Sequence, residues 1–187
     1  YICMFTIKQE NMISRSLLIE SKKLRVFDFD DTLVTTTSYI YITKSNGTKL
    51  KLTPGQYAVY NEKPGDEFDY SDFQKVQDPL EIKKITNVLR RIMNSSGGDG
   101  VYILTARSAY KPIKQYLKDI GINSNKIFVV ALASNNPKDK ADWIEAKIDN
   151  EGYDDVYFAD DSEKNVDATK KMLRGKDVRW RVQLIKH

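Results

Sequence analysis

The chain has 187 residues, which suits one domain or one domain with a modest insertion rather than two full domains. Its 41% hydrophobic and 30% charged residues are typical of a globular protein, and no apolar run approaches the roughly 18 residues that a membrane-spanning helix needs. The net charge of +4 permits an anionic substrate but does not by itself indicate a nucleic-acid-binding protein.

Cysteine and histidine are scarce, and this narrows the chemistry. Cys3 is the single cysteine, which excludes an intrachain disulfide, and the single histidine is the last residue, His187. Catalytic triads that need histidine and zinc sites built from His and Cys are therefore excluded. Catalysis has to use carboxylates, Lys, Arg, Ser, Thr or a hard metal ion.

The N-terminal stretch "YICMFTIKQENMISRSLLIESKK" lacks the basic-then-apolar plan and the small-residue cleavage site of a secretory signal. We therefore expect a cytoplasmic protein without a membrane segment. Because residue 1 is Tyr, Met12 is a candidate for the natural start. No feature of the sequence indicates the oligomeric state.

Five short apolar segments rich in β-forming residues predict strands. They cover residues 24–29, 101–106, 126–132, 155–160 and 178–185. Helical patterns separate them, and strands that alternate with helices indicate a parallel sheet with helices on both faces. The expected fold class is therefore α/β, with a Rossmann-like sheet.

Capping residues and prolines predict where the helices begin. The first helix should follow an Asp78 cap, with Pro79 in its first turn, and the second should open at Ser108. Two further helices are predicted over residues 139–152 and 162–175, the latter capped by Ser162.

Residues 35–77 form an exception to the alternating pattern and are long enough to be an insertion. The stretch "SYIYITKSNGTKLKLT" alternates on both sides of an "SNGT" turn and predicts a β-hairpin. We expect a small module beside a core domain made of residues 1–34 and 78–187. Its aromatic residues can form the module's own core or stack on a nucleic-acid base, and the sequence leaves both open. They are Tyr39, Tyr41, Tyr57, Tyr60, Phe68, Tyr70 and Phe73.

Polar residues gather where the predicted strands end. The first strand is followed by Asp28, Asp30 and Asp31, the second by Thr105 and Arg107, and the fourth by Asp160 and Asp161. Ligands of doubly wound sheets bind at this edge. Like charges repel there unless a cation lies among them, and an acidic site with only oxygen ligands selects Mg²⁺.

The spacing of the first two acids suits a division of labour. Alternation along a strand sends Asp28 and Asp30 to the same side. An ionised Asp is a competent nucleophile toward phosphorus, and a second Asp can protonate a leaving alkoxide and later accept a proton from water.

Four sequence pieces in order resemble the haloacid dehalogenase (HAD) superfamily of phosphotransferases over most of the chain. They are "DFDDT" (28–32), "LTAR" (104–107), a lysine before a helix, and "FADDS" (158–162). The resemblance implies a Rossmann-like core with a small cap inserted after the first strand.

The resemblance also implies roles for individual residues. Asp28 would be the nucleophile that forms an aspartyl-phosphate, and Asp30 the general acid and base. Thr105 would donate a hydrogen bond to the phosphoryl group. Asp160 would bind Mg²⁺ together with Asp28 and the backbone carbonyl of Asp30, and Asp161 would support the metal site.

Two lysines compete for the family's lysine position, which is followed by apolar residues three and four positions later. Lys140 meets this condition through Trp143 and Ile144, whereas Lys138 does not. We expect Lys140 to balance the charge of the nucleophile and the phosphoryl group, with Lys138 held in reserve.

Three supporting residues are assigned structural roles. Asp31 should belong to the turn, Thr32 should shape the loop around the metal site, and Asn165 should buttress the acidic loop from behind.

Within the family, an acid at the Asp30 position favours hydrolysis of a phosphomonoester over dehalogenation or a long-lived phosphoenzyme. Arg107 resembles a position that some polynucleotide 3′-phosphatases use to grip phosphate, but a structural ion pair suits arginine equally well. The predicted function is a Mg²⁺-dependent phosphatase acting on a nucleotide, a polynucleotide end or a small phosphorylated metabolite. The alternatives are a non-catalytic HAD-like module that binds nucleic acid or protein, and a phosphotransferase.

Overall fold

The computed structural model describes residues 20–186, so the candidate start at Met12 lies outside the described part of the chain. The strands are β1 (Lys23–Phe27), β2 (Val34–Thr35), β3 (Ile40–Thr43), β4 (Lys49–Leu52), β5 (Glu67–Asp69), β6 (Leu80–Glu81), β7 (Val101–Thr105), β8 (Phe128–Ala131), β9 (Asp155–Asp160) and β10 (Arg179–Leu184). The helices are α2 (Pro54–Ala58), α3 (Lys83–Ser96), α4 (Lys111–Asp119), α5 (Pro137–Glu151) and α6 (Glu163–Leu173), with short 3₁₀ turns at Ser71–Gln74 and Ser124–Lys126.

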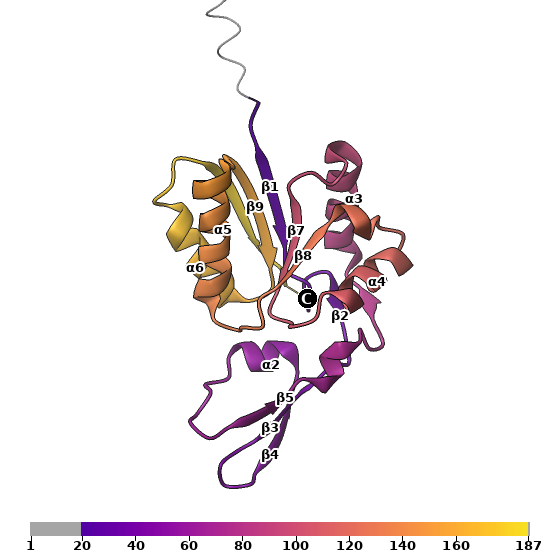
Figure 1. Cartoon of the computed structure of the whole chain (residues 1–187), viewed down its shortest axis with the longest axis vertical. Coiled ribbons are helices and arrows are strands. Elements are labelled where there is room, and N and C mark those ends of the chain that lie inside the picture. Colours follow the sequence, from indigo (N-terminus) through magenta and orange to yellow (C-terminus); the bar gives the residue numbers. More distant parts are fainter. Residues whose placement is uncertain (1–19, 187) are drawn as a thin grey trace, which may run out of the picture.

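A five-stranded parallel sheet forms the centre of the core domain, in the order β10-β9-β1-β7-β8. Phe27 in β1 lies opposite Ile103 in β7 and Ala159 in β9. Figure 1 shows β1 between these neighbours, with helices on both sides of the sheet. The predicted α/β class with a Rossmann-like parallel sheet is confirmed.

The two faces of the sheet are covered by different helix pairs. One face packs against α3 and α4, where Leu89 and Ile113 join Phe27 in one buried cluster. The opposite face packs against α5 and α6, where Ile144 and Leu173 join strand residues such as Leu24, Val26 and Phe158. Because both faces are covered, the central strands carry apolar residues at successive positions rather than an alternating pattern.

The strand order places a switch point beside β1. After β1 the chain builds β7 and β8 on one side, and then crosses to build β9 and β10 on the other side. The connections that leave the carboxyl ends of β1 and β9 therefore run to opposite sides, and ligands of open α/β sheets bind at such a point.

Residues between β2 and β6 form a separate small unit, which we call the cap. Its three-stranded antiparallel sheet has the order β4-β3-β5, and the pairing of β3 with β4 confirms the predicted hairpin. Ile40, Ile42 and Phe73 are buried in its own cluster, with Tyr57, Tyr60 and Phe68 packed against them. In Figure 1 the cap lies beyond the carboxyl end of β1, across from α5 and α6.

Both connections between core and cap pass through one short antiparallel ribbon. In this ribbon Val34 of β2 pairs with Glu81 of β6, and Thr35 pairs with Leu80. The helix predicted to begin at Asp78 is therefore wrong at its start, because pairing with β2 extends the backbone at residues 80–81. Asp78 instead has a positive φ of 42° and accepts a hydrogen bond from the Thr37 hydroxyl.

The second helix also begins later than predicted, at Lys111 rather than Ser108, with Pro112 in its first turn. The predicted start at Ser162 is confirmed, since its side chain accepts a hydrogen bond from the Asn165 amide at the beginning of α6. Across residues 20–186, no helix combines the length and apolar character needed to cross a membrane.

Candidate active site

A tight turn after β1 carries the first group of acids to the edge of the sheet. The Asp28 amide donates to the Ala159 carbonyl at 2.9 Å, which continues the β1–β9 ladder by one residue. The Phe29 carbonyl then accepts from the Leu33 amide at 2.9 Å, and Asp31 adopts a positive φ of 54°. Asp31 therefore belongs to the turn, while Asp28 and Asp30 precede its sharpest point.

Lys140 joins the first acid of β1 to the last acid of β9. From the first turns of α5, its ammonium group lies 2.6 Å from Asp28 Oδ1 and 2.7 Å from Asp160 Oδ2, and all three side chains are buried. Lys138 points elsewhere: its side chain is 73% exposed and pairs with Asp142. The structure thus brings Lys140, and not Lys138, into the acidic cluster.

Burial and charge shift the pKa values of this group. Desolvation raises the pKa of Asp28 well above its usual range, opposed by Lys140 and reinforced by Asp160 and Asp161. Burial lowers the pKa of Lys140, but the adjacent Asp160 and Asp28 carboxylates more than offset this, so its pKa is raised and the ammonium form is favoured.

The two acids of "FADDS" are held by different neighbours. Asp160 accepts hydrogen bonds from the Ser162 amide at 2.8 Å and from Asn165 Nδ2 at 3.0 Å, so Asn165 makes the contact expected of it. Thr32 Oγ1 accepts from the Asp161 amide at 3.0 Å, which ties the β1 turn to the end of β9. Burial, followed by repulsion from Asp160 and Asp31, raises the pKa of Asp161 to about 7.

Three carboxylates of the cluster are suited to hold a cation. Asp28, Asp160 and Asp161 each offer one oxygen, and these oxygens lie within 4.8 Å of one another. With the three carboxylates ionised and Lys140 protonated, the cluster carries two net negative charges, which one divalent cation would balance. Hard cations such as Mg²⁺ prefer oxygen ligands, and Mg²⁺ is usually bound by one or two carboxylates with substrate phosphate and water completing its shell. The residues present therefore fit a Mg²⁺ ion.

Asp30 is held by Arg107 in a two-pronged ion pair. Arg107 Nε donates to one carboxylate oxygen at 2.8 Å, and Nη2 donates to the other at 2.6 Å. The guanidinium group also donates to the Lys75 carbonyl at 2.9 Å and lies 4.5 Å from the centre of the Phe73 ring. Of the two roles left open for Arg107, the structure shows the ion pair, and this same side chain connects the core to the cap.

Thr105 ends β7 beside these groups. It is 1% exposed, and its hydroxyl accepts a hydrogen bond from the Arg107 amide at 3.2 Å. That bond uses one lone pair of the oxygen and leaves the hydroxyl proton for another acceptor.

A cavity of about 160 Å³ lies over the cluster, between core and cap. Asp28, Asp30, Thr105, Lys140 and Asp161 reach its wall, whereas Asp160 is fully buried beside them. The predicted site residues, from four different strand ends or helices, therefore meet at one place.

Two parts of the wall lie outside the predicted site residues, although Tyr57, Tyr70 and Phe73 of the cap are among the aromatic residues for which base stacking was left open. Residues 133–136, which follow β8, contribute small and amide side chains, and their place after a parallel strand is the signal that could have identified them. The cap contributes Ile40, Pro54, Tyr57, Tyr70 and Phe73. Their position over the site depends on how the cap docks, for which the sequence gives no local signal.

Comparison of the chain with protein-family models, with curated proteins and with solved structures found no match. The function of this site therefore has to be inferred from its own residues.

Proposed function

We propose that the protein is a Mg²⁺-dependent phosphomonoester hydrolase of the HAD type, acting through an aspartyl-phosphate. The observation that carries the proposal is that one cavity is lined by two carboxylates, each in contact with a different cation. Asp28 is buried against Lys140, and Asp30 stands two residues away in contact with Arg107. This arrangement supports Asp28 as the nucleophile, with Lys140 to balance its charge, and Asp30 as the acid and base beside it.

In the first step, a carboxylate oxygen of Asp28 attacks phosphorus and forms an O–P bond as the bond from phosphorus to the alcohol oxygen breaks. Asp30 gives a proton to the departing alkoxide. Each oxygen of Asp30 accepts one hydrogen bond from Arg107, and a second lone pair on each oxygen remains for this proton.

In the second step, Asp30 accepts a proton from a water molecule, whose oxygen attacks the phosphorus of the aspartyl-phosphate. The bond between phosphorus and Asp28 then breaks, which releases phosphate, restores the Asp28 carboxylate and leaves Asp30 protonated for the next cycle. The Lys140 ammonium and the Thr105 hydroxyl donate to the phosphoryl oxygens in both steps.

Mg²⁺ held by Asp28, Asp160 and Asp161 would supply charge neutralisation for the phosphoryl oxygens. The rigid support of Asp160 by Ser162 and Asn165 keeps this carboxylate in place.

The test is release of inorganic phosphate from a broad phosphomonoester panel, with Mg²⁺ or with EDTA, for the wild-type protein, Asp28→Asn and Asp30→Asn. We expect Mg²⁺-dependent release by the wild type and loss of turnover in both variants. Full activity of Asp28→Asn, or an inactive wild type, would contradict the proposal. Phosphate found on an acceptor other than water would instead identify a phosphotransferase.

A further inference from the structure

The charges in the cavity wall are confined to the reaction centre. The charged side chains that reach the wall are Asp28, Asp30, Arg107, Lys140 and Asp161. Both cations among them already contact carboxylates, Lys140 with Asp28 and Arg107 with Asp30. Within the described wall, no further cation remains for a second phosphate or a carboxylate on the substrate. An anion buried without a partner is costly, so the alcohol part of the substrate should be neutral.

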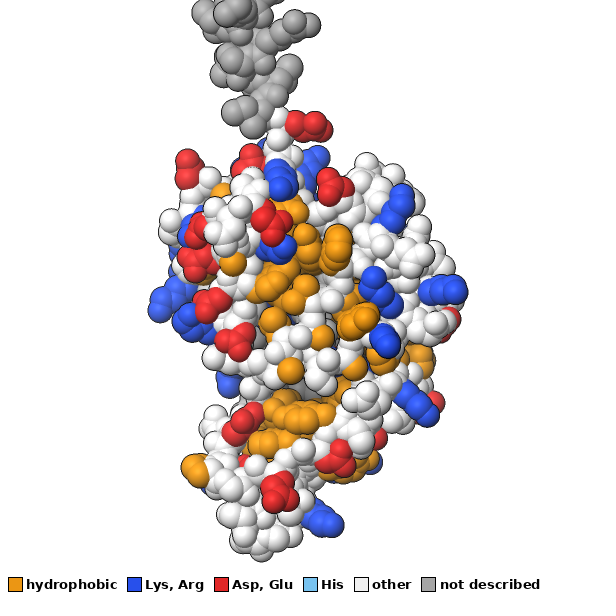
Figure 2. Space-filling view, in the orientation of Figure 1, with side chains coloured by type: hydrophobic (Ala, Val, Ile, Leu, Met, Phe, Trp, Pro, Cys, Tyr) orange, Lys and Arg blue, Asp and Glu red, His pale blue; other side chains and the backbone are white. Residues whose placement is uncertain are grey.

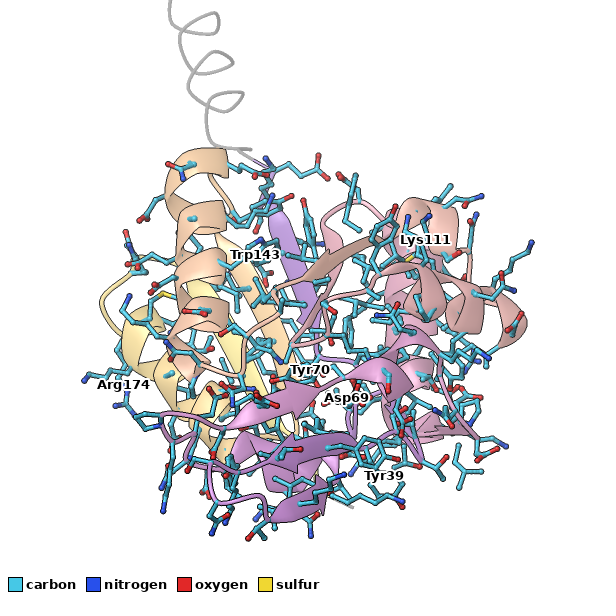
Figure 3. All side chains as sticks on the ribbon, turned by 60° about the horizontal axis from the view of Figure 1, so that its bottom comes forward. Tyr39, Asp69, Tyr70, Lys111, Trp143 and Arg174 are labelled. Atoms are coloured by element: carbon cyan, nitrogen blue, oxygen red, sulfur yellow. The ribbon has the colours of Figure 1, made fainter. Side chains whose placement is uncertain are left out.

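The cap side of the cavity is apolar and aromatic. Tyr70 is the most open of its rings: it is 39% exposed and stacks on Phe68 at an interplanar angle of 14°. The Tyr57 ring meets Tyr70 edge-on at 5.8 Å, and the two hydroxyls lie 2.6 Å apart, which fixes both rings. Figure 3 shows Tyr70 where the cap adjoins the core, while Tyr39 lies farther out on the cap.

The core side of the cavity is polar but uncharged. Ser108, Ser134, Asn135 and Asn136 provide hydroxyl and amide groups. Asn135 Nδ2 donates to Glu62 of the cap at 3.2 Å, so the two walls are joined at the rim of the cavity. In Figure 2, hydrophobic side chains gather on the part of the cap that faces the core.

These walls suit a group with a flat apolar face and a polar edge. A nucleobase has both: its face stacks on aromatic side chains, and its edge exchanges hydrogen bonds with amides and hydroxyls. A polyol offers polar groups but no such face. Glu62 at the rim, whose carboxylate already accepts from Tyr57, also disfavours a neighbouring phosphodiester.

We propose that the preferred substrate is a nucleoside monophosphate, with the phosphate at the acidic cluster and the base between Tyr70 and the 133–136 loop. This inference rests on the proposed function, because it names the alcohol that the same site releases.

The test measures binding by calorimetry to Asp28→Asn protein with Mg²⁺, so that turnover does not interfere. The ligands are nucleoside 3′- and 5′-monophosphates, glycerol phosphate, glucose 6-phosphate, a nucleoside 3′,5′-bisphosphate and a 3′-phosphorylated oligonucleotide. We expect at least one monophosphate to bind roughly tenfold more tightly than glycerol phosphate, the factor that stacking of one base commonly provides.

A second substitution, made in the Asp28→Asn protein, tests whether the Tyr70 ring is responsible for the preference for nucleotides. Tyr70→Leu should reduce the ratio of the two affinities by roughly tenfold, because it removes the stacking surface. Tyr41→Leu is the matched control, since Tyr41 is 36% exposed on the same cap but lies outside the cavity wall. The ratio of the two affinities in this variant should equal that of the Asp28→Asn protein.

Glycerol phosphate or glucose 6-phosphate binding as tightly as every nucleotide would overturn the inference, as would tighter binding of the bisphosphate or the oligonucleotide. An equal loss of the ratio in Tyr41→Leu would also overturn it. Hydrolysis by the wild type without a nucleotide preference would refute this inference alone. A nucleotide preference without hydrolysis of any phosphomonoester would support the nucleotide site and refute the proposed function.

Discussion

Lys140 separates two carboxylates that would otherwise face each other in a buried space. Its ammonium group lies within hydrogen-bond distance of both Asp28 and Asp160. Removing one partner from a buried ionic cluster is more damaging than removing an exposed pair, because the remaining charges stay desolvated. Replacing Lys138, whose ion pair with Asp142 is exposed, should therefore have a smaller effect than replacing Lys140.

We expect Lys140→Met to lower kcat/KM on a phosphomonoester by about a hundredfold or more, the usual loss for one charge-stabilising donor. Lys138→Met should stay within about twofold, because an exposed ion pair contributes little. Initial rates of phosphate release measure both, and thermal unfolding of each variant separates lost activity from lost fold. Equal rates for the two variants would remove Lys140 from the proposed mechanism.

The sequence was informative about single residues where the signal is local. The resemblance expects apolar residues three and four positions after the lysine, which favoured Lys140 through Trp143 and Ile144, and this lysine does reach the acids. The pairing of Arg107 with Asp30 joins positions 77 residues apart, and arginine suits a phosphate or a carboxylate equally, so only the folded chain distinguishes the two.

At the scale of elements, strands were predicted better than helix starts. The central strands are short, apolar and covered on both faces, a pattern that few other elements share. The first helix start failed because Asp78 and Pro79 look like a cap and a first turn. Pairing of β6 with β2, a contact between distant segments, determined the local backbone instead.

The turn before β7 contains a glycine that no other residue can replace without strain. Gly100 has φ +65°, and a Cβ there would lie 2.1 Å from the Lys23 carbonyl oxygen of β1. The Gly100 carbonyl also accepts a hydrogen bond from the Arg25 amide of β1 at 2.8 Å, which limits how far the backbone at Gly100 can move away from β1.

We expect Gly100→Ala to destabilise the protein by about 1–3 kcal/mol more than Gly121→Ala, because overpacking adds to the cost of the positive φ. Gly121 has φ +77° with nothing within 4 Å of an added Cβ, so it isolates the conformational cost. Urea unfolding of both variants gives the comparison. Equal free energies of unfolding would show that the β1–β7 junction can shift to admit a methyl group.

Low pH should weaken the contribution of the β2–β6 ribbon to stability, because this ribbon contains Glu81. The hydrogen bond from Arg90 to Glu81, at 2.5 Å, lowers the pKa of Glu81 below its ordinary 4.5, with a further contribution from Thr86. A lowered folded-state pKa contributes stability that is present above the unfolded value and is lost as pH falls through the folded one.

The wild type should therefore lose stability below about pH 4.5 more steeply than Glu81→Gln, by about 0.5 kcal/mol once solvent screening of this partly exposed pair is included. Urea unfolding at pH 7 and pH 3 measures the difference for both proteins. An equal loss of unfolding free energy between pH 7 and pH 3 in the wild type and Glu81→Gln would show that protonation of Glu81 does not affect folding.

At the scale of the whole molecule, the acidic cluster links segments from both ends of the described chain. Asp28 follows β1, and Asp160 and Asp161 lie at and just after the end of β9, so a cation bound by all three would tie the end of β1 to the end of β9. A ligand that binds only the folded state stabilises it by mass action.

Mg²⁺ at about a hundred times its Kd should stabilise the protein by about 2.7 kcal/mol, a rise in Tm of about 5–10 °C for a chain of this length. Asp161→Asn should reduce that rise, whereas Asp142→Asn, on the exposed face of α5, should leave it unchanged. Scanning calorimetry with Mg²⁺ and with EDTA measures the shift. The same rise in all three proteins would place the ion elsewhere.

The core and the cap differ in how far the sequence determined them. The parallel sheet follows from alternating strands and helices, and the hairpin follows from the turn at "SNGT". The docking of the cap over the site depends on contacts such as Arg107 with the Lys75 carbonyl and Asn135 with Glu62, which no local pattern encodes.

The β2–β6 ribbon gives the insertion a particular freedom. Because Val34 and Glu81 are paired neighbours, the chain leaves the core and returns to it at adjacent points. The ends of the insertion stay together whatever lies between them, and doubling the length of a flexible loop adds only about 0.6 kcal/mol to the entropy of closing it. The cap can therefore lengthen, shorten or be exchanged for another without rethreading the sheet. Under the proposed function, selectivity for the leaving group could then diverge while Asp28 and Asp30 stay at the end of β1.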